Sequence, residues 1–130
     1  MNRLNRPNVM TNSYFGKDNE VYVEYIDFTG NTYDTPTYTL YKANNGKLMP
    51  ASGMIELPFG SVSCVDGWFH KECGYAFTTE TDGNSYYLDG QLYEKEKEYC
   101  AELLRRGKER NDEAVIQWCM AKTLGSNNEP

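Results

Sequence analysis

The sequence predicts an α+β fold, in which an antiparallel β-meander of about four to six strands is followed by two C-terminal helices packed on the sheet. Two observations support this prediction. From Val21 to Leu88, apolar and aromatic residues alternate with a period of two between turn-forming Asn-Gly and Asp-Gly pairs. After Asp89 and Gly90 the apolar residues recur at steps of three and four, which is the helical period.

The chain has 130 residues, the usual size of one domain, and we place that domain at residues 21–125 with its strands at 21–90. Residues 1–20 contain Asn, Arg, Pro and Ser without periodicity, so a flexible N-terminal arm is expected there. Residues 126–130, with the sequence SNNEP, are expected to form a disordered tail.

The first predicted strand is VYVEYIDF at residues 21–28, which is rich in β-branched and aromatic residues. The next is TYTLYK at 37–42, which begins after Pro36 because proline cannot donate to a ladder. Asn45 and Gly46 tolerate positive φ and predict a tight turn back through residues 47–49. The segment ASGMIEL lies between two prolines and is compatible with either an edge strand or an irregular loop.

Two further hairpins are predicted. SVSCV and WFHKE flank Asp66-Gly67, and a two-residue turn there pairs Val65 with Trp68, Cys64 with Phe69 and Ser63 with His70. GYAFTT and SYYL flank a second turn around Asp82, Gly83 and Asn84.

Helices are predicted at residues 92–106 and 112–123. Asp89 or Gly90 is expected to cap the first helix and Gly107 to end it, while Asn111 is expected to cap the second. The residues expected to pack on the sheet are Leu103, Leu104, Val115 and Trp118.

The stretch CVDGWFHKEC raises the question of a metal site. Cys64, His70 and Cys73 have ligand types that suit zinc, and Cys100 or Cys119 would complete a four-ligand set. WFHKEC also resembles the W-F-H-x-x-C stretch inside plant homeodomain zinc fingers, although the paired CxxC motifs of those fingers are absent and no function is carried over. The hairpin register places Cys64 and His70 on opposite faces, which argues against shared ligation.

Catalysis has little support in the sequence. His70 is the only imidazole, so a nucleophile would need Cys73 or another residue brought to it by a bend. Glycine-rich phosphate loops are absent, no cofactor is expected, and the basic cluster of Arg105, Arg106, Lys108 and Arg110 is interpreted as a solvated helix end. We therefore expect a protein that is not an enzyme. An uncharacterised enzyme using Cys73 or His70 is one alternative, and a zinc-supported adaptor built on Cys64, His70 and Cys73 is another.

The charge map and the tyrosines point to protein binding. Residues 21–90 carry nine acids and three bases, which equals the net charge of the whole chain, −6. Nine of the eleven tyrosines lie between Tyr14 and Tyr87; tyrosine suits both a half-buried sheet and a recognition surface. The residues expected to bind a partner are Tyr22, Glu24, Asp27, Tyr33, Asp34, Tyr38, Glu80, Asp82 and Tyr86.

We therefore expect a small acidic protein-binding module, an inhibitor or modulator that covers a basic surface of a nucleic-acid-handling partner. A viral or mobile-element accessory protein acting against host defence is our hypothesis for its origin. Direct nucleic-acid binding is not expected, because neutralising phosphates needs a basic stripe and the strand segment is acidic. The sequence has no apolar run suited to a signal or a membrane span, so a cytoplasmic location is expected, and the oligomeric state is left open.

Overall fold

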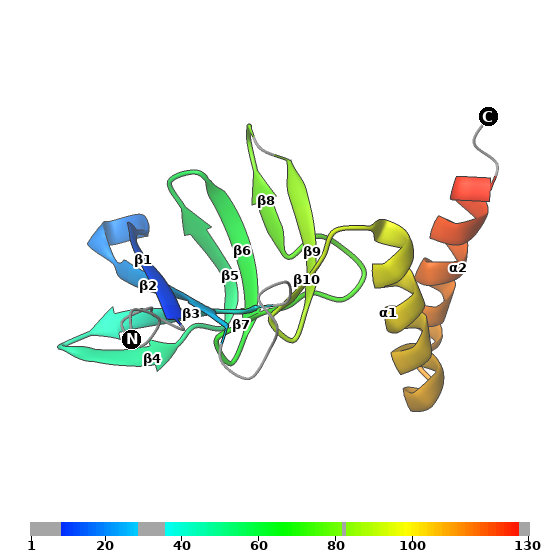
Figure 1. The fold of residues 1–130 in the computed structure, drawn as a ribbon, viewed down its shortest axis with the longest axis horizontal. Helices are drawn as coiled ribbons and strands as arrows, with labels where there is room; N and C mark the ends of the chain where they lie inside the picture. Colours follow the sequence, from blue (N-terminus) through cyan, green and yellow to red (C-terminus); the bar gives the residue numbers. More distant parts are fainter. Residues whose placement is uncertain (1–8, 29–35, 82, 128–130) are drawn as a thin grey trace, which may run out of the picture.

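The structure is a computed structural model that describes residues 9–28, 36–81 and 83–127. Within these residues ten strands form one antiparallel sheet, and two helices follow it (Figure 1). The α+β class is therefore confirmed, while the strands outnumber the prediction. The strands are β1 Val9–Phe15, β2 Val21–Asp27, β3 Thr37–Asn44, β4 Lys47–Pro50, β5 Gly53–Leu57, β6 Gly60–Val65, β7 Trp68–Phe69, β8 Phe77–Thr79, β9 Asn84–Leu88 and β10 Gln91–Tyr93.

The expected N-terminal arm contains a strand. Every residue of β1 pairs with β2, from Val9 with Asp27 to Phe15 with Val21, and a short 3-10 turn at Lys17–Asn19 joins the two. The prediction of a flexible arm is thus wrong for residues 9–20, because pairing with β2 orders a segment whose own sequence has little periodicity. Residues 1–8 of that arm lie outside the described residues, as do residues 128–130 of the expected tail. The prediction of a disordered tail is wrong for Ser126 and Asn127, which form the end of the second helix.

The predicted tight turns are confirmed where the structure describes them. Asn45 and Gly46 have φ of 52° and 81°, and Asp66 and Gly67 have φ of 49° and 88°, so both pairs adopt the left-handed geometry of a two-residue hairpin. The register around the second turn is also as predicted, with Val65 opposite Trp68 and Cys64 opposite Phe69.

Both helices are shifted along the chain from their predicted positions. Helix α1 spans Glu96–Arg110 and α2 spans Glu113–Asn127. Asp89 and Gly90 do not cap α1. They form another hairpin turn, with φ of 51° and 81°, and Leu92 in β10 pairs with Tyr87 in β9. Asp89-Gly90 is the same Asp-Gly dipeptide from which the turn at Asp66-Gly67 was predicted.

Gly107 does not end α1 but lies buried inside it. A Cβ at this position would meet Val115 Cγ1 at 2.9 Å, so glycine allows α1 and α2 to approach closely. The helix ends instead at Asn111, which adopts left-handed φ of 56° and is not the cap of the next helix. That role falls to Asp112, whose Oδ1 accepts a hydrogen bond from the Val115 N–H at 3.3 Å.

The sheet curls until its two ends meet. The strand order runs from β1 to β5, yet the ring of Tyr14 in β1 lies 4.9 Å from that of Phe59 beyond β5. The curl encloses an inner core built on the concave face. Its buried members are Tyr22, Leu40, Ala51, Leu57, Val62, Cys64, Phe69, Ala76 and Tyr87.

A second, helical core lies between the helices and the middle strands of the sheet, where α1 contacts β9 and β10 (Figure 1). Its buried members are Tyr86, Leu88, Tyr99, Cys100, Leu103, Val115 and Cys119. Of the four residues expected to face the sheet, Leu103 and Val115 are buried here, and Leu104 and Trp118 pack against it half-buried.

Candidate protein-binding surface

The register of the strands separates the outer face of the sheet from the face that holds the inner core. Cross-strand partners share a face, and β10, β7 and β4 pair in turn along one edge of β3. One outer row contains Phe15, Val21, Ala43 and Leu48; the next contains Ser13, Val23, Tyr41 and Pro50; a third contains Thr11, Tyr25, Thr39, Trp68 and Val65.

These rows form what we call the apolar patch, defined by Phe15, Val21, Val23, Tyr25, Tyr41, Leu48, Pro50, Val65 and Trp68. Several of its large side chains are exposed: Phe15 is 68% exposed, Val65 52%, Trp68 45% and Leu48 44%. None of the three rows contains a charged residue, and the ring of Tyr25 meets that of Tyr41 edge-on at 5.2 Å. A contiguous exposed patch of this kind is typical of interaction sites.

The residues predicted to bind a partner do not form a single surface. Tyr22, Glu24 and Tyr86 are buried, the first two on the inner face and the third in the helical core. Tyr38 is half-buried against the inner core and contacts the ring of Tyr87 at 5.2 Å. The prediction that these tyrosines and Glu24 lie on a binding face is therefore wrong for the buried members.

Glu24 is the clearest exception to the rule that acids face water. Its Oε1 accepts hydrogen bonds from Asn12 Nδ2 and from the Tyr14 hydroxyl, each at 3.0 Å. Burial and the adjacent carboxylate raise the pKa of Tyr14 to about 12, so the hydroxyl keeps the proton it donates. Glu24 thus joins β1 to β2 and is not available to a partner.

The other predicted residues have different positions. Asp27 lies on the outer face at the end of β2 and is half-buried, and Glu80 is exposed beyond β8. Tyr33, Asp34 and Asp82 lie outside the described residues.

The three candidate zinc ligands occupy three separate environments. Cys64 faces the inner core, where burial raises the pKa of its thiol to about 12, and Cys73 packs against the helical core. His70 Nδ1 accepts the Asp89 N–H at 2.9 Å, and its Nε2 lies 3.7 Å from Glu72. Among the described residues no group of three or more His, Cys, Asp or Glu side chains is arranged to hold a metal ion.

The basic cluster on α1 forms ion pairs that join the helix to the sheet. Arg106 lies 2.6 Å from Asp89 in the β9–β10 turn and 2.8 Å from Glu102, and Arg110 lies 2.9 Å from Glu72. Hydrogen bonds from Arg105 and Arg106 lower the pKa of the Glu102 carboxyl to about 2. Each of these arginines is therefore paired with at least one acid of α1, of the β9–β10 turn or of the segment before β8.

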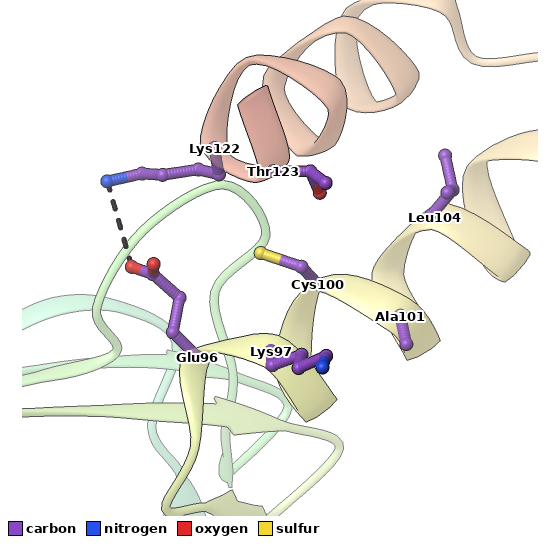
Figure 2. A pocket seen from close by; sticks show the side chains of 7 residues that line it. All are labelled: Glu96, Lys97, Cys100, Ala101, Leu104, Lys122 and Thr123. Atoms are coloured by element: carbon purple, nitrogen blue, oxygen red, sulfur yellow. Dashed lines mark ion pairs between the residues drawn. The ribbon is translucent and has the colours of Figure 1, made fainter. Parts of the chain in front are cut away.

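A groove of about 440 Å³ runs between α1 and α2 (Figure 2). Cys100, Ala101 and Leu104 line it from α1, and Lys122 and Thr123 line it from α2. Lys122 and Glu96 pair across its mouth at 3.8 Å. Nothing in the groove identifies a ligand, so we assign it no function.

Another concave feature lies where β9 and β10 meet α1. We call it the tyrosine hollow; its lining comprises Tyr75, Asn84, Ser85, Tyr86, Leu92, Tyr93, Glu94 and Glu96. Of these residues only Tyr86 was predicted from the sequence to bind a partner. The alternation of β10 would have indicated Tyr93, had residues 91–93 been assigned to a strand.

Comparisons of the chain with protein-family models, curated proteins and solved structures found no match. In the described part of the chain, neither helix is long and apolar enough to cross a membrane. Function must therefore be inferred from the surface itself.

Proposed function

We propose that this protein is a non-catalytic protein-binding module whose docking surface is the apolar patch. The observation that carries the proposal is the absence of charged residues from three neighbouring rows that expose Phe15, Trp68 and Val65. The centres of protein interfaces are depleted in charge and enriched in aromatic residues, whereas the solvated face of a sheet is mostly polar, because each strand turns its apolar side chains inward and its polar ones outward.

The charges around the patch favour a partner with basic groups. Asp18 lies three residues after Phe15, Asp66 lies between Val65 and Trp68, and Asp27 lies on the outer face at the end of β2. The bases beside the patch are fewer: Lys17, which pairs with Glu56 at 3.6 Å, and Lys47. A partner with an apolar centre and a border of lysine or arginine would complement these acids and bind faster because of the attraction. A second copy of this chain would add its own acids to the same border, which disfavours self-association.

The narrower hypothesis is that the partner handles nucleic acid and is inhibited by this protein. Proteins that bind nucleic acid neutralise phosphates with lysine and arginine, so they present the basic surfaces that an acidic module can cover. This part of the proposal is supported by the charge of the strand segment, −6 over residues 21–90, and by no contact in the structure.

Site-specific photo-crosslinking tests the docking surface. A benzophenone amino acid replaces Phe15 or Trp68, both exposed on the patch, and Met120, which is exposed on α2, provides the control position. In extract of the native cells we expect one partner protein to be crosslinked from the two patch positions and not from Met120. Adducts between two copies of this chain, or equal yields from Met120, would overturn the proposal.

The identified partner then allows a quantitative test. Phe15→Ser combined with Trp68→Ser should weaken binding by at least about tenfold, because exposed aromatic anchors carry much of the energy of an interface. Met120→Ser is the matched control, and Leu48→Ser provides a second patch variant if the double variant is unstable. Unchanged affinity in the folded patch variants would refute the assignment.

A further inference from the structure

The tyrosine hollow is built around a column of three stacked rings. Tyr99 is fully buried and stacks on Tyr86 at 4.1 Å, and Tyr86 stacks on Tyr75 at 4.4 Å. Tyr75 is the outermost ring and is 38% exposed. One end of the column is thus fixed in the helical core while the other presents an aromatic ring to solvent.

The column is held in place by hydrogen bonds to the backbone beside it. The Tyr99 hydroxyl donates to the Lys71 carbonyl at 2.6 Å and accepts the Gly74 N–H at 3.2 Å. Tyr75 follows Gly74 directly, so this anchor also positions the outermost ring. A flat ligand meets a preformed platform there, which lowers the entropic cost of binding.

Two carboxylates border the same hollow. Glu96 accepts a hydrogen bond from the Tyr86 hydroxyl at 2.5 Å and lies 3.8 Å from Lys122, so its charge is already partly compensated. Burial first, and the bond to Glu96 second, raise the pKa of Tyr86, which keeps its hydroxyl protonated as the donor. Glu94 is exposed and has no hydrogen bond or ion pair within the described residues.

We infer that the tyrosine hollow binds a guanidinium group, stacked on Tyr75 and paired with Glu94. A guanidinium is flat and cationic, so it can lie on a tyrosine ring while its N–H groups form two parallel bonds to a carboxylate. An ammonium group has the charge without the plane, and a phosphate or nucleotide would be repelled by Glu94 and Glu96. That the guanidinium belongs to an arginine of a partner protein rests on the function proposed above.

The binding chemistry can be tested without the partner. Nuclear magnetic resonance titration of the folded chain with N-acetyl-arginine methylamide should give saturable shifts of the backbone amides of Tyr75, Tyr86 and Glu94, with a dissociation constant of about tens of millimolar, as expected for one exposed contact. The lysine analogue should bind more weakly. The citrulline analogue, which has nearly the same shape but no charge, should give no saturable shifts.

Two variants and two controls locate the site. Glu94→Gln and Tyr75→Leu should each weaken arginine binding by about threefold or more, while Glu98→Gln, an exposed acid that does not line the hollow, should leave it unchanged. The Phe15→Ser and Trp68→Ser variant should also bind arginine normally. Equal shifts with citrulline, or unchanged binding in Glu94→Gln, would overturn this inference and leave the test of the apolar patch unaffected.

Discussion

Removing one oxygen from Tyr99 should loosen the attachment of the helices to the sheet. The ring of Tyr99 is fully buried between Tyr86 and the edge of Trp118, at centroid distances of 4.1 Å and 6.0 Å. Its hydroxyl donates to the Lys71 carbonyl at 2.6 Å and accepts the Gly74 N–H at 3.2 Å. The hydroxyl also lies 3.1 Å from the Gly74 carbonyl, and Tyr99→Phe keeps the ring and deletes these three contacts.

The expected cost follows from the three backbone groups left behind, the Lys71 carbonyl and the N–H and carbonyl of Gly74. A buried donor or acceptor that loses its partner costs about 1–3 kcal/mol, and more than one group is affected here. Lys71 and Gly74 are half-buried, so water can partly replace the lost hydroxyl. We therefore expect Tyr99→Phe to lower the free energy of unfolding by about 2 kcal/mol, a large share of the 5–15 kcal/mol typical of a domain.

Urea unfolding followed by tryptophan fluorescence provides the measurement. Trp118 reports on the helical core and Trp68 on the sheet, so variants that retain one tryptophan each show whether the two parts unfold together. We expect coincident transitions in the wild type and an earlier transition at both tryptophans in Tyr99→Phe. Tyr41→Phe, on the outer face, is the control and should change stability by less than about 0.5 kcal/mol. A similarly small change in Tyr99→Phe would refute the role given to its hydroxyl.

Two further predictions concern charge and pH. Glu24→Lys should destabilise the fold by about 3 kcal/mol or more, because it buries a cation beside Asn12 and Tyr14. Glu80→Lys, at an exposed position, should be nearly neutral. Equal urea midpoints for the two variants would contradict this prediction. Burial raises the pKa of Tyr14 and Tyr99 from 10.0 to about 12, so folding favours the protonated hydroxyls. Their contribution to the free energy of unfolding should be fully present below pH 10 and should be lost as the pH rises toward 12. Unfolding free energies measured across that interval that stay level would exclude this linkage.

The sequence predicted most of the local structure where turn chemistry was strong. The pairs Asn45-Gly46 and Asp66-Gly67 determined both the turn and the register of the strands around them, because only residues tolerant of positive φ fit a two-residue hairpin. The ends of α1 were misplaced for the opposite reason. Asp89-Gly90 was assigned to a helix cap, and Gly107 was interpreted as a stop although its missing Cβ serves the contact with α2.

The binding surface could not be predicted to the same degree. Alternation divides β2 into two sets of side chains, but both sets contain apolar residues, and alternation alone does not say which set faces the core. The acid Glu24 suggested that its set faced water. Only the pairing of β1 with β2, which supplies Asn12 and Tyr14 as partners for the carboxylate, explains why that set lies inside.

This inversion is also the strongest physical argument for the apolar patch. Of the charged residues on β2 and β3, Glu24 and Lys42 lie on the inner face, and only Asp27, at the end of β2, lies on the outer face. Val21, Val23 and Tyr41 also lie on the outer face. A sheet face that merely meets water gains nothing from that arrangement, since the same strands supply charged side chains that could have been turned outward. Farther along the sheet, the outer face is covered by the helices, which bury Tyr86 and Leu88 of β9. The apolar patch, which no helix covers, is apolar and aromatic like the part of the outer face under the helices. A partner protein on the patch would bury it in the same way.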